Sequence, residues 1–96
     1  MANLQSKIII FENKKTSIRL ATDEWDAIEY ICKHENIKRN QLIELINSSK
    51  SPYLTLTSSI RLFSIIYFYS TLQKLQNYDI TAIQSSSVSE AIHSII

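Results

Sequence analysis

The feature that most constrains the fold is a strict alternation of side chains near the N-terminus of the chain. Thr16, Ile18 and Leu20 occupy every second position, and Ser17 and Arg19 lie between them. In an extended strand, successive side chains point to opposite faces, so this spacing separates the apolar side chains from the polar ones. The segment is therefore predicted to form a strand with one buried face and one face open to a partner.

The outward face of this strand is basic and rich in hydrogen-bond donors. Residues 14–19 hold three basic residues and no acid, whereas residues 23–35 hold five acidic residues and one lysine. Lys38 and Arg39 follow as a second basic pair. The net charge of the chain is only +1, so the distribution of charge, more than its total, indicates a ribbon that contacts DNA.

The composition bounds the class of protein. A chain of 96 residues allows one domain, and oligomerisation is a common way for so small a domain to bury more surface. Hydrophobic residues make up 45% and charged residues 20%, which indicates a globular chain and not a disordered one. No signal peptide is expected. The longest apolar stretch, residues 60–72, is too short for a membrane span of about 20 residues.

Catalysis and metal binding are not expected. The single cysteine, Cys32, makes no intrachain disulfide and no zinc site, and it fits a reducing cytoplasm. His34 and His93 are far apart in the sequence and lack ligand spacing. No nucleophile–base pair, phosphate loop or metal cluster is visible, and the chain has no glycine with which to build such a loop. We expect neither an enzyme nor a cofactor.

The first helix is predicted to begin at Thr22 and to end near Asn36. Thr22 is a good N-cap, and the acidic residues behind it suit the positive end of the helix dipole. Trp25, Ile28 and Cys32 form its apolar stripe. Because glycine is absent, asparagine is expected where a turn needs a positive φ. The candidates are Asn13, Asn36, Asn47 and Asn77.

Two more helices are predicted on either side of residues 48–52, a polar stretch that holds the only proline. Their expected limits are Arg39 or Asn40 to Asn47, and Leu56 or Thr57 to Gln76. Thr57 and Ser58 are the candidate caps of the later helix. That helix is apolar nearly all round, which in a small chain implies a partner subunit.

Both ends of the chain carry further signals. Residues 7–11 favour a strand, which is either an extra strand or an extended arm lying over a dimer. Glu12 and Asn13 are expected to form the turn that follows. At the other end, Ser87 begins a capping box, and an apolar stripe predicts a short terminal helix that packs back or joins subunits. The stripe consists of Val88, Ala91, Ile92 and Ile95.

Four blocks in series, from about residue 7 to residue 70, carry a family resemblance. The blocks are Lys15-Thr16-Ser17-Ile18-Arg19-Leu20, Trp25-Asp26-Ala27-Ile28, Asn36-Ile37-Lys38-Arg39-Asn40-Gln41-Leu42-Ile43 and Leu56-Thr57-Ser58-Ser59-Ile60-Arg61-Leu62-Phe63. In this order and spacing they resemble the ribbon-helix-helix superfamily of the MetJ and Arc type, and more narrowly a group of small bacterial ribbon-helix-helix proteins. Residues 71–96 lie outside the resemblance.

The resemblance implies a mainly α fold with a short β-strand, arranged as an intertwined homodimer. Two strands, one from each subunit, would pair antiparallel and enter the major groove as a two-stranded ribbon, with an extra helix at the C-terminus. Lys15, Ser17 and Arg19 would then contact the bases. The resemblance divides the chain into an N-terminal arm (1–13), a ribbon-helix-helix domain (14–76) and a C-terminal extension (77–96).

Phosphate binding is expected beside the ribbon, at the N-terminus of the second helix, where backbone N–H groups are free to bind an anion. The expected phosphate contacts are Lys14, Lys38, Arg39 and Asn40. Two positions depart from the family pattern. Asn36 stands where the family usually has glycine, and Lys38 stands where it often has serine or threonine.

The function expected from the resemblance is that of a sequence-specific transcriptional regulator, either a repressor or an antitoxin-like autoregulator, located in the cytoplasm with the nucleoid. Its partners would be double-stranded DNA and a second copy of the chain, with pairing of dimers into a tetramer left open. The alternative is a dimerisation or protein-interaction module without DNA binding, using residues 71–96 for a protein partner. The expected dimer core is Ile18, Leu20, Trp25, Ile28, Leu42, Ile43, Ile60, Phe63 and Tyr67.

Overall fold

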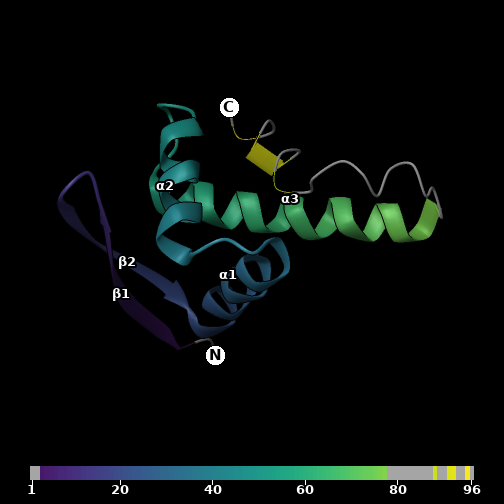
Figure 1. The fold of residues 1–96 in the computed structure, drawn as a ribbon, viewed down its shortest axis with the longest axis horizontal. Helices are drawn as coiled ribbons and strands as arrows, with labels where there is room; N and C mark the ends of the chain where they lie inside the picture. Colours follow the sequence, from purple (N-terminus) through teal and green to yellow (C-terminus); the bar gives the residue numbers. More distant parts are fainter. Residues whose placement is uncertain (1–2, 78–87, 89–90, 93–94, 96) are drawn as a thin grey trace. The chain divides into compact units, whose positions relative to one another are not determined.

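The computed structural model describes residues 3–77 together with Val88, Ala91, Ile92 and Ile95. The chain divides into two compact units, Met1–Ser48 and Ser49–Ile96. A two-stranded antiparallel sheet comes first along the chain, and three helices follow it (Figure 1). The elements are β1 (Leu4–Phe11), β2 (Lys14–Ala21), α1 (Thr22–Glu35), α2 (Arg39–Ser49) and α3 (Leu56–Asn77).

Strands β1 and β2 form a hairpin within the chain. Their register pairs Leu4 with Ala21 at the open end and Phe11 with Lys14 beside the turn. The turn residues Glu12 and Asn13 have φ values of 52° and 61°, the conformation that suits a two-residue hairpin turn. Of the two alternatives for the N-terminal segment, the structure contains the extra strand.

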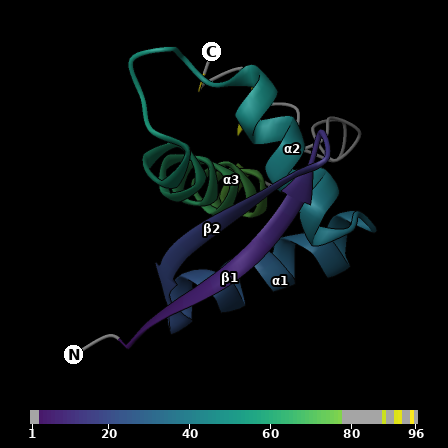
Figure 2. The ribbon, with the colours of Figure 1, turned by 90° about the vertical axis from the view of Figure 1, so that its left-hand side faces the viewer.

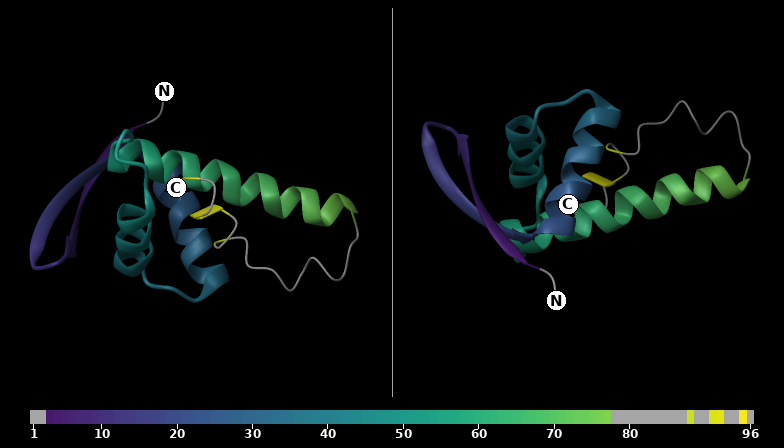
Figure 3. Two further views of the ribbon diagram at one scale, coloured as in Figure 1. Left: turned by 90° about the horizontal axis from the view of Figure 1, so that it is seen from above. Right: turned by 90° about the horizontal axis from the view of Figure 1, so that it is seen from below.

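The hairpin packs against α1 through one face. Figure 2 shows it crossing α1, and Figure 3 shows its turn projecting away from that helix. On the face toward the helix, Ile9, Ile18 and Leu20 are fully or almost fully buried. Because opposite residues in an antiparallel pair share a face, β1 and β2 contribute jointly to this part of the core.

The start of α1 differs from the expectation. The N-cap is Ala21 and Thr22 is the first helical residue, so the prediction of Thr22 as N-cap is wrong. The Glu24 carboxylate accepts a hydrogen bond from the Ala21 N–H at 2.8 Å. The Thr22 hydroxyl instead donates to the Asn3 carbonyl at 3.1 Å, and the Thr22 N–H donates to the same oxygen at 2.9 Å. Thr22 therefore joins the beginning of the hairpin to the helix.

The connection between α1 and α2 is as predicted. Asn36 adopts the left-handed conformation, with φ 53° and ψ 51°, and its N–H and that of Ile37 both donate to the Cys32 carbonyl. This arrangement satisfies the end of α1 without glycine. Asn47 lies inside α2 and Asn77 ends α3, so the expectation of a turn at Asn47 is wrong. Helix α2 continues two residues beyond its predicted end.

In the second unit, α3 spans almost the predicted range but is capped by a different residue. The Thr55 hydroxyl accepts a hydrogen bond from the Ser58 N–H at 3.1 Å and donates to the Ser58 hydroxyl at 2.9 Å. Thr55 is therefore the cap. The prediction of Thr57 and Ser58 is wrong because the helix begins at Leu56, before either residue.

The described residues near the C-terminus agree with the predicted apolar stripe. Val88, Ala91, Ile92 and Ile95 have helical backbone, and Ala91 and Ile95 are buried. The Ser51 N–H donates to the Ile95 carbonyl at 3.0 Å, so this segment packs back on its own unit. The capping box predicted at Ser87 lies outside the described residues.

All nine residues expected in a dimer core are buried within the single chain. Leu20, Ile28, Leu42, Ile43 and Phe63 have no exposed surface at all. These side chains stabilise the chain itself, and their part in an interface between subunits stays a prediction.

The left-handed cap gives a direct test of the fold. Replacing Asn36 with glycine should leave the free energy of unfolding nearly unchanged, because glycine adopts a positive φ readily. Replacing it with alanine should lower that free energy by about 1–2 kcal/mol. Urea unfolding of the two variants and the natural chain measures both effects, and equal stability of the variants would contradict the role of this cap.

Candidate nucleic-acid interface

The outer face of the hairpin carries the side chains predicted to contact bases. Lys15, Ser17 and Arg19 are exposed, and Ile18 between them is buried. The alternation predicted for this strand is therefore present. Lys14 is exposed beside the turn.

Strand β1 adds an apolar row to the same outer face. In the register of the hairpin, Ile10 lies opposite Lys15 and Ile8 lies opposite Ser17, whereas Ser6 lies opposite Arg19. Ile8 is 60% exposed and Ile10 is 51% exposed. The outer face is thus half basic and half apolar, which the alternation in β2 alone does not indicate.

Trp25 holds the hairpin on the helices. Its indole N–H donates to the Gln5 carbonyl in β1 at 2.9 Å, and the side chain is almost fully buried. The Lys7 ammonium lies 5.4 Å from the ring centroid and the Arg39 guanidinium 5.8 Å from it, both within cation–π range. One side chain of α1 therefore contacts groups from β1 and from the start of α2.

The N-terminus of α2 is capped without a hydroxyl side chain. The Lys38 N–H donates to the Gln41 side-chain oxygen at 3.2 Å, and the Lys38 carbonyl accepts the first helical hydrogen bond, from Leu42, at 2.9 Å. The first N–H groups of a helix have no partner within it, so those of Arg39 and Asn40 can bind an anion. Gln41 thus satisfies the N–H of the cap residue itself, whereas a serine or threonine at position 38 would accept from an N–H of the first helical turn.

The side chains at this helix end differ in exposure. Lys38 and Asn40 are exposed, whereas Arg39 is half-buried. The Nε of Arg39 is buried and has no hydrogen-bond partner among the residues that the structure describes. Lys38 and Asn40 are thus available to a phosphate, and Arg39 is turned toward the Trp25 ring.

A surface hollow of about 380 Å³ lies beside this helix end. It is formed by the last turn of α1, the connection and the first turn of α2. Its lining residues are Cys32, Lys33, Asn36, Ile37, Lys38 and Gln41. Lys33 and Lys38 are both exposed, and two positive charges in the lining make this hollow suited to an anion.

Cys32 lines the hollow and is half-buried, less enclosed than its place on the apolar stripe suggested. Burial raises the pKa of its thiol above the usual 9.0, the positive charge of Arg39 lowers it, and the negative charge of Glu29 raises it. The net direction is upward, so the neutral thiol is the favoured form.

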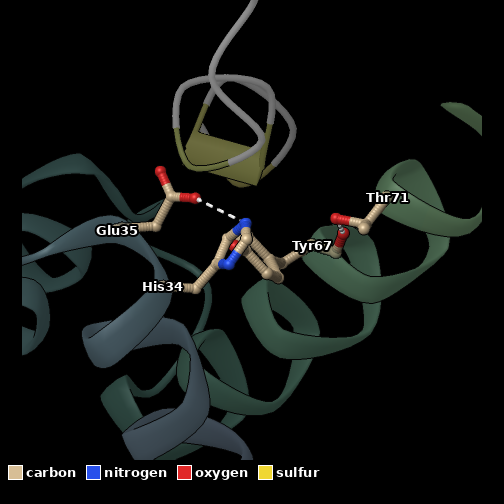
Figure 4. Close-up of polar contacts among 4 residues, drawn as sticks. All are labelled: His34, Glu35, Tyr67 and Thr71. Carbon is tan, nitrogen blue, oxygen red and sulfur yellow. Dashed lines mark hydrogen bonds and ion pairs between the residues drawn. The ribbon is translucent and has the colours of Figure 1, made fainter. Parts of the chain in front are cut away.

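Two further polar contacts each lie within a single helix. The His34 imidazole lies 4.0 Å from the Glu35 carboxylate, and within α3 the Thr71 hydroxyl donates to the Tyr67 carbonyl at 2.9 Å (Figure 4). Within residues 3–77 and the four described residues after them, no cluster of three or more His, Cys, Asp or Glu side chains is placed to hold a metal ion. None of the described helices has the length and hydropathy needed to cross a membrane.

Comparison with known protein families decides the identity of the fold. The model of the ribbon-helix-helix domain matches residues 4–68, which include both strands, α1, α2 and the first half of α3. The chain belongs to the ribbon-helix-helix family. Searches of curated proteins and of solved structures found no match.

Members of the ribbon-helix-helix family are in general DNA-binding regulators, and they typically bind DNA as dimers. The fold itself is non-enzymatic. In this ribbon-helix-helix chain, the expected ribbon strand is β2, and the two expected helices are α1 and α2.

The contribution of strand β1 to the outer face was not predicted from the sequence, although three consecutive isoleucines at residues 8–10 marked this segment as β-prone.

The contribution of the Cys32 thiol to the free energy of unfolding should depend on pH, because folding raises its pKa. Because folding raises the pKa of this thiol, the group contributes stability below pH 9.0 that is lost as the pH rises through the higher, folded value. The difference in unfolding free energy between the natural chain and Cys32→Ser should therefore shrink in urea titrations above pH 9.0. A difference that grows with pH would contradict the raised pKa.

Proposed function

We propose that this chain is a homodimeric, sequence-specific DNA-binding regulator that contacts the major groove through β2. The observation that carries the proposal is the outer face of β2, where Lys15, Ser17 and Arg19 are exposed in alternate positions and Ile18 and Leu20 between and beside them are buried. Lysine and arginine donate to the O6 and N7 atoms of guanine, and serine bonds to several bases. The family membership supports the same activity.

The dimer would form along the free edge of β2. Within the described residues the sheet has two strands, so β2 pairs with β1 along one edge only. Antiparallel pairing of two copies of β2 would give a four-stranded sheet with the base-contacting side chains on its two central strands. Strands lie about 4.8 Å apart, so the outer strands would be about 14 Å apart. The groove is about 12 Å wide, and both copies of β1 would therefore lie over its rims.

Phosphate contacts would position this sheet. Lys14 lies beside the hairpin turn, and Lys38 and Asn40 lie at the N-terminus of α2 beside the hollow. Phosphate contacts orient a protein on the duplex, whereas base contacts determine the preferred sequence. Arg39 would act indirectly, through the Trp25 ring, which supports the hairpin.

At the level of regulation, we propose a repressor or an antitoxin-like autoregulator. A compact dimer that binds a short operator can act by excluding other proteins from it, and such exclusion needs no enzymatic step. Its place of action would be the nucleoid.

A second function is favoured by a specific observation. The exposed Ile8 and Ile10 on the hairpin and the low net charge of +1 suit a protein-interaction module that retains the fold without binding DNA. The two functions are separated by DNA binding at low salt, where non-specific electrostatic attraction is strongest.

Base contacts are tested with duplexes selected from a random pool by the full chain. Lys15→Ala and Arg19→Ala should each weaken binding to the selected duplex by about 5- to 150-fold, corresponding to about 1–3 kcal/mol per base contact, and should relax the selected sequence. Lys74→Ala, a change of the same charge in α3, is the control. If a chain carrying both Lys15→Ala and Arg19→Ala bound the selected duplex as tightly as the natural chain, β2 would not contact the bases. A stoichiometry of one chain per DNA site would mean that a single hairpin, and not a ribbon from two chains, contacts the groove.

Phosphate contacts have a different signature. Lys38→Ala should weaken binding to all sequences alike. It should also reduce the slope of log affinity against log salt by about 0.9 for each phosphate that is no longer neutralised. Lys74→Ala, which removes the same charge from α3, is the matched control. Fluorescence anisotropy across a salt series measures the slope, and a change in the selected sequence would place Lys38 on a base instead.

A further inference from the structure

The exposed isoleucines of β1 lie directly beside the side chains proposed to contact bases. In the register of the hairpin, Ile10 is opposite Lys15 and Ile8 is opposite Ser17. Opposite residues of an antiparallel pair have Cβ atoms about 5 Å apart on the same face. Any surface that closely contacts Lys15 and Ser17 therefore also covers Ile10 and Ile8.

These two isoleucines point away from the core of their unit. Ile9, between them, is fully buried, whereas Ile8 and Ile10 are each more than half exposed, as the alternation of a strand requires. Threonine is also β-branched and suits a strand, and it would expose a hydroxyl group to water. Isoleucine at both positions therefore favours a partner that carries apolar groups on its surface.

The charge of the outer face restricts the chemistry of that partner. Neither β1 nor β2 contains an aspartate or a glutamate, and Lys15 and Arg19 are exposed on the same face as the isoleucines. The face therefore complements an anionic surface on which apolar groups lie beside hydrogen-bond acceptors. The major groove of DNA has this combination, because the C5-methyl group of thymine shares the edge of an A·T pair with the N7 and O4 acceptors.

We infer that Ile8 and Ile10 contact the C5-methyl groups of thymine, so that β1 selects A·T pairs next to the bases contacted by β2. On each A·T edge the methyl group lies at the pyrimidine end, next to the wall of the groove. The proposed four-stranded sheet would place β1 over that wall, and a single hairpin in the groove would turn the same row toward the bases. The inference rests on the proposed function, since it needs β2 in the major groove.

The geometry of the strand sets the expected spacing of these thymines. Residues two apart in a strand are separated by about 7 Å. Successive base pairs are stacked about 3.4 Å apart. Ile8 and Ile10 should therefore reach thymines within a run of about three base pairs. Ser6, the next outward residue of β1, lies opposite Arg19 and can bond to any base, so no thymine is required there.

The first experiment changes the DNA and leaves the protein intact. Duplexes selected from a random pool by the full chain should carry thymine at fixed positions next to those that depend on Lys15 and Arg19. Replacing such a thymine with deoxyuridine removes only the methyl group and should weaken binding about 4-fold, the effect of one buried methyl or methylene group. Deoxyuridine outside the bound site is the control. A selected sequence without fixed thymines, or an affinity unchanged by the replacement, would overturn the inference.

The second experiment assigns the methyl contact to the isoleucines. In Ile8→Ala and Ile10→Ala chains, deoxyuridine at the thymine that each side chain contacts should no longer weaken binding. The quantity measured is the ratio of two affinities of one variant, so a loss of stability in that variant cancels. Ile65→Ala, the same truncation at an exposed position of α3, is the matched control and should retain the full deoxyuridine effect. An effect that persists in both hairpin variants would overturn the role of the isoleucines.

The outcomes separate this inference from the proposed function. Absence of binding to any duplex at low salt would overturn both, and the apolar row of β1 would then be assigned to a protein partner. Binding that depends on Lys15 and Arg19, with equal affinity for thymine and deoxyuridine duplexes, would overturn only the role of the isoleucines. A deoxyuridine effect that the isoleucine variants abolish supports the inference, whether one chain or two occupy the site.

Discussion

The hydrogen bond from the Trp25 indole to the Gln5 carbonyl is the interaction on which the ribbon depends. It crosses from α1 to β1, the strand that is not directly connected to the helix, and it is 2.9 Å long. The same ring has the Lys7 ammonium at 5.4 Å and the Arg39 guanidinium at 5.8 Å from its centroid. Buried tryptophan combines a large apolar surface with one obligatory donor, so one side chain orients a strand and a helix N-terminus together.

The burial of one face of β2 explains how a nearly neutral chain can present a basic surface. Ile18 and Leu20 are buried under β2, which forces the side chains between them outward. The positive charges that result stand on a two-stranded sheet, a more rigid base than a loop. Rigid placement is what hydrogen bonding to base edges requires, whereas total charge governs mainly non-specific attraction.

The hairpin and the long helix α3 have one property in common. Each has one apolar face buried in the chain and further apolar side chains exposed, at Ile8 and Ile10 in β1 and at Ile65, Leu72 and Leu75 in α3. A chain of 96 residues cannot cover all of its apolar surface alone.

Local features were predicted well because they depend on neighbours in the sequence. The alternation in β2, the turn at Glu12 and Asn13, and the left-handed Asn36 all follow from steric preferences of a few adjacent residues. Helix starts were less predictable. Thr22 looked like a cap, but its hydroxyl donates to Asn3, which is 19 residues away, and Thr55 caps α3 in place of Thr57 or Ser58.

The base-contact candidates in β2 were predictable from local spacing. The exposure of the side chains at the start of α2 depended on packing between elements. Lys15, Ser17 and Arg19 lie on the exposed face as the spacing of two required. Lys38 and Arg39 looked equivalent in the sequence, but their exposure differs because Arg39 packs toward Trp25. The hollow beside α2 likewise arises only when the end of α1 and the start of α2 meet.

The alternation of the basic strand β2 was determined by the sequence alone, since the period of two in a strand is a property of the backbone. Its partner strand was decided by the tertiary structure. Residues 7–11 were compatible with an arm or a strand, and the choice depended on the Trp25 bond to Gln5 and the burial of Ile9. These contacts join residues that are far apart in the sequence, and no local preference encodes them.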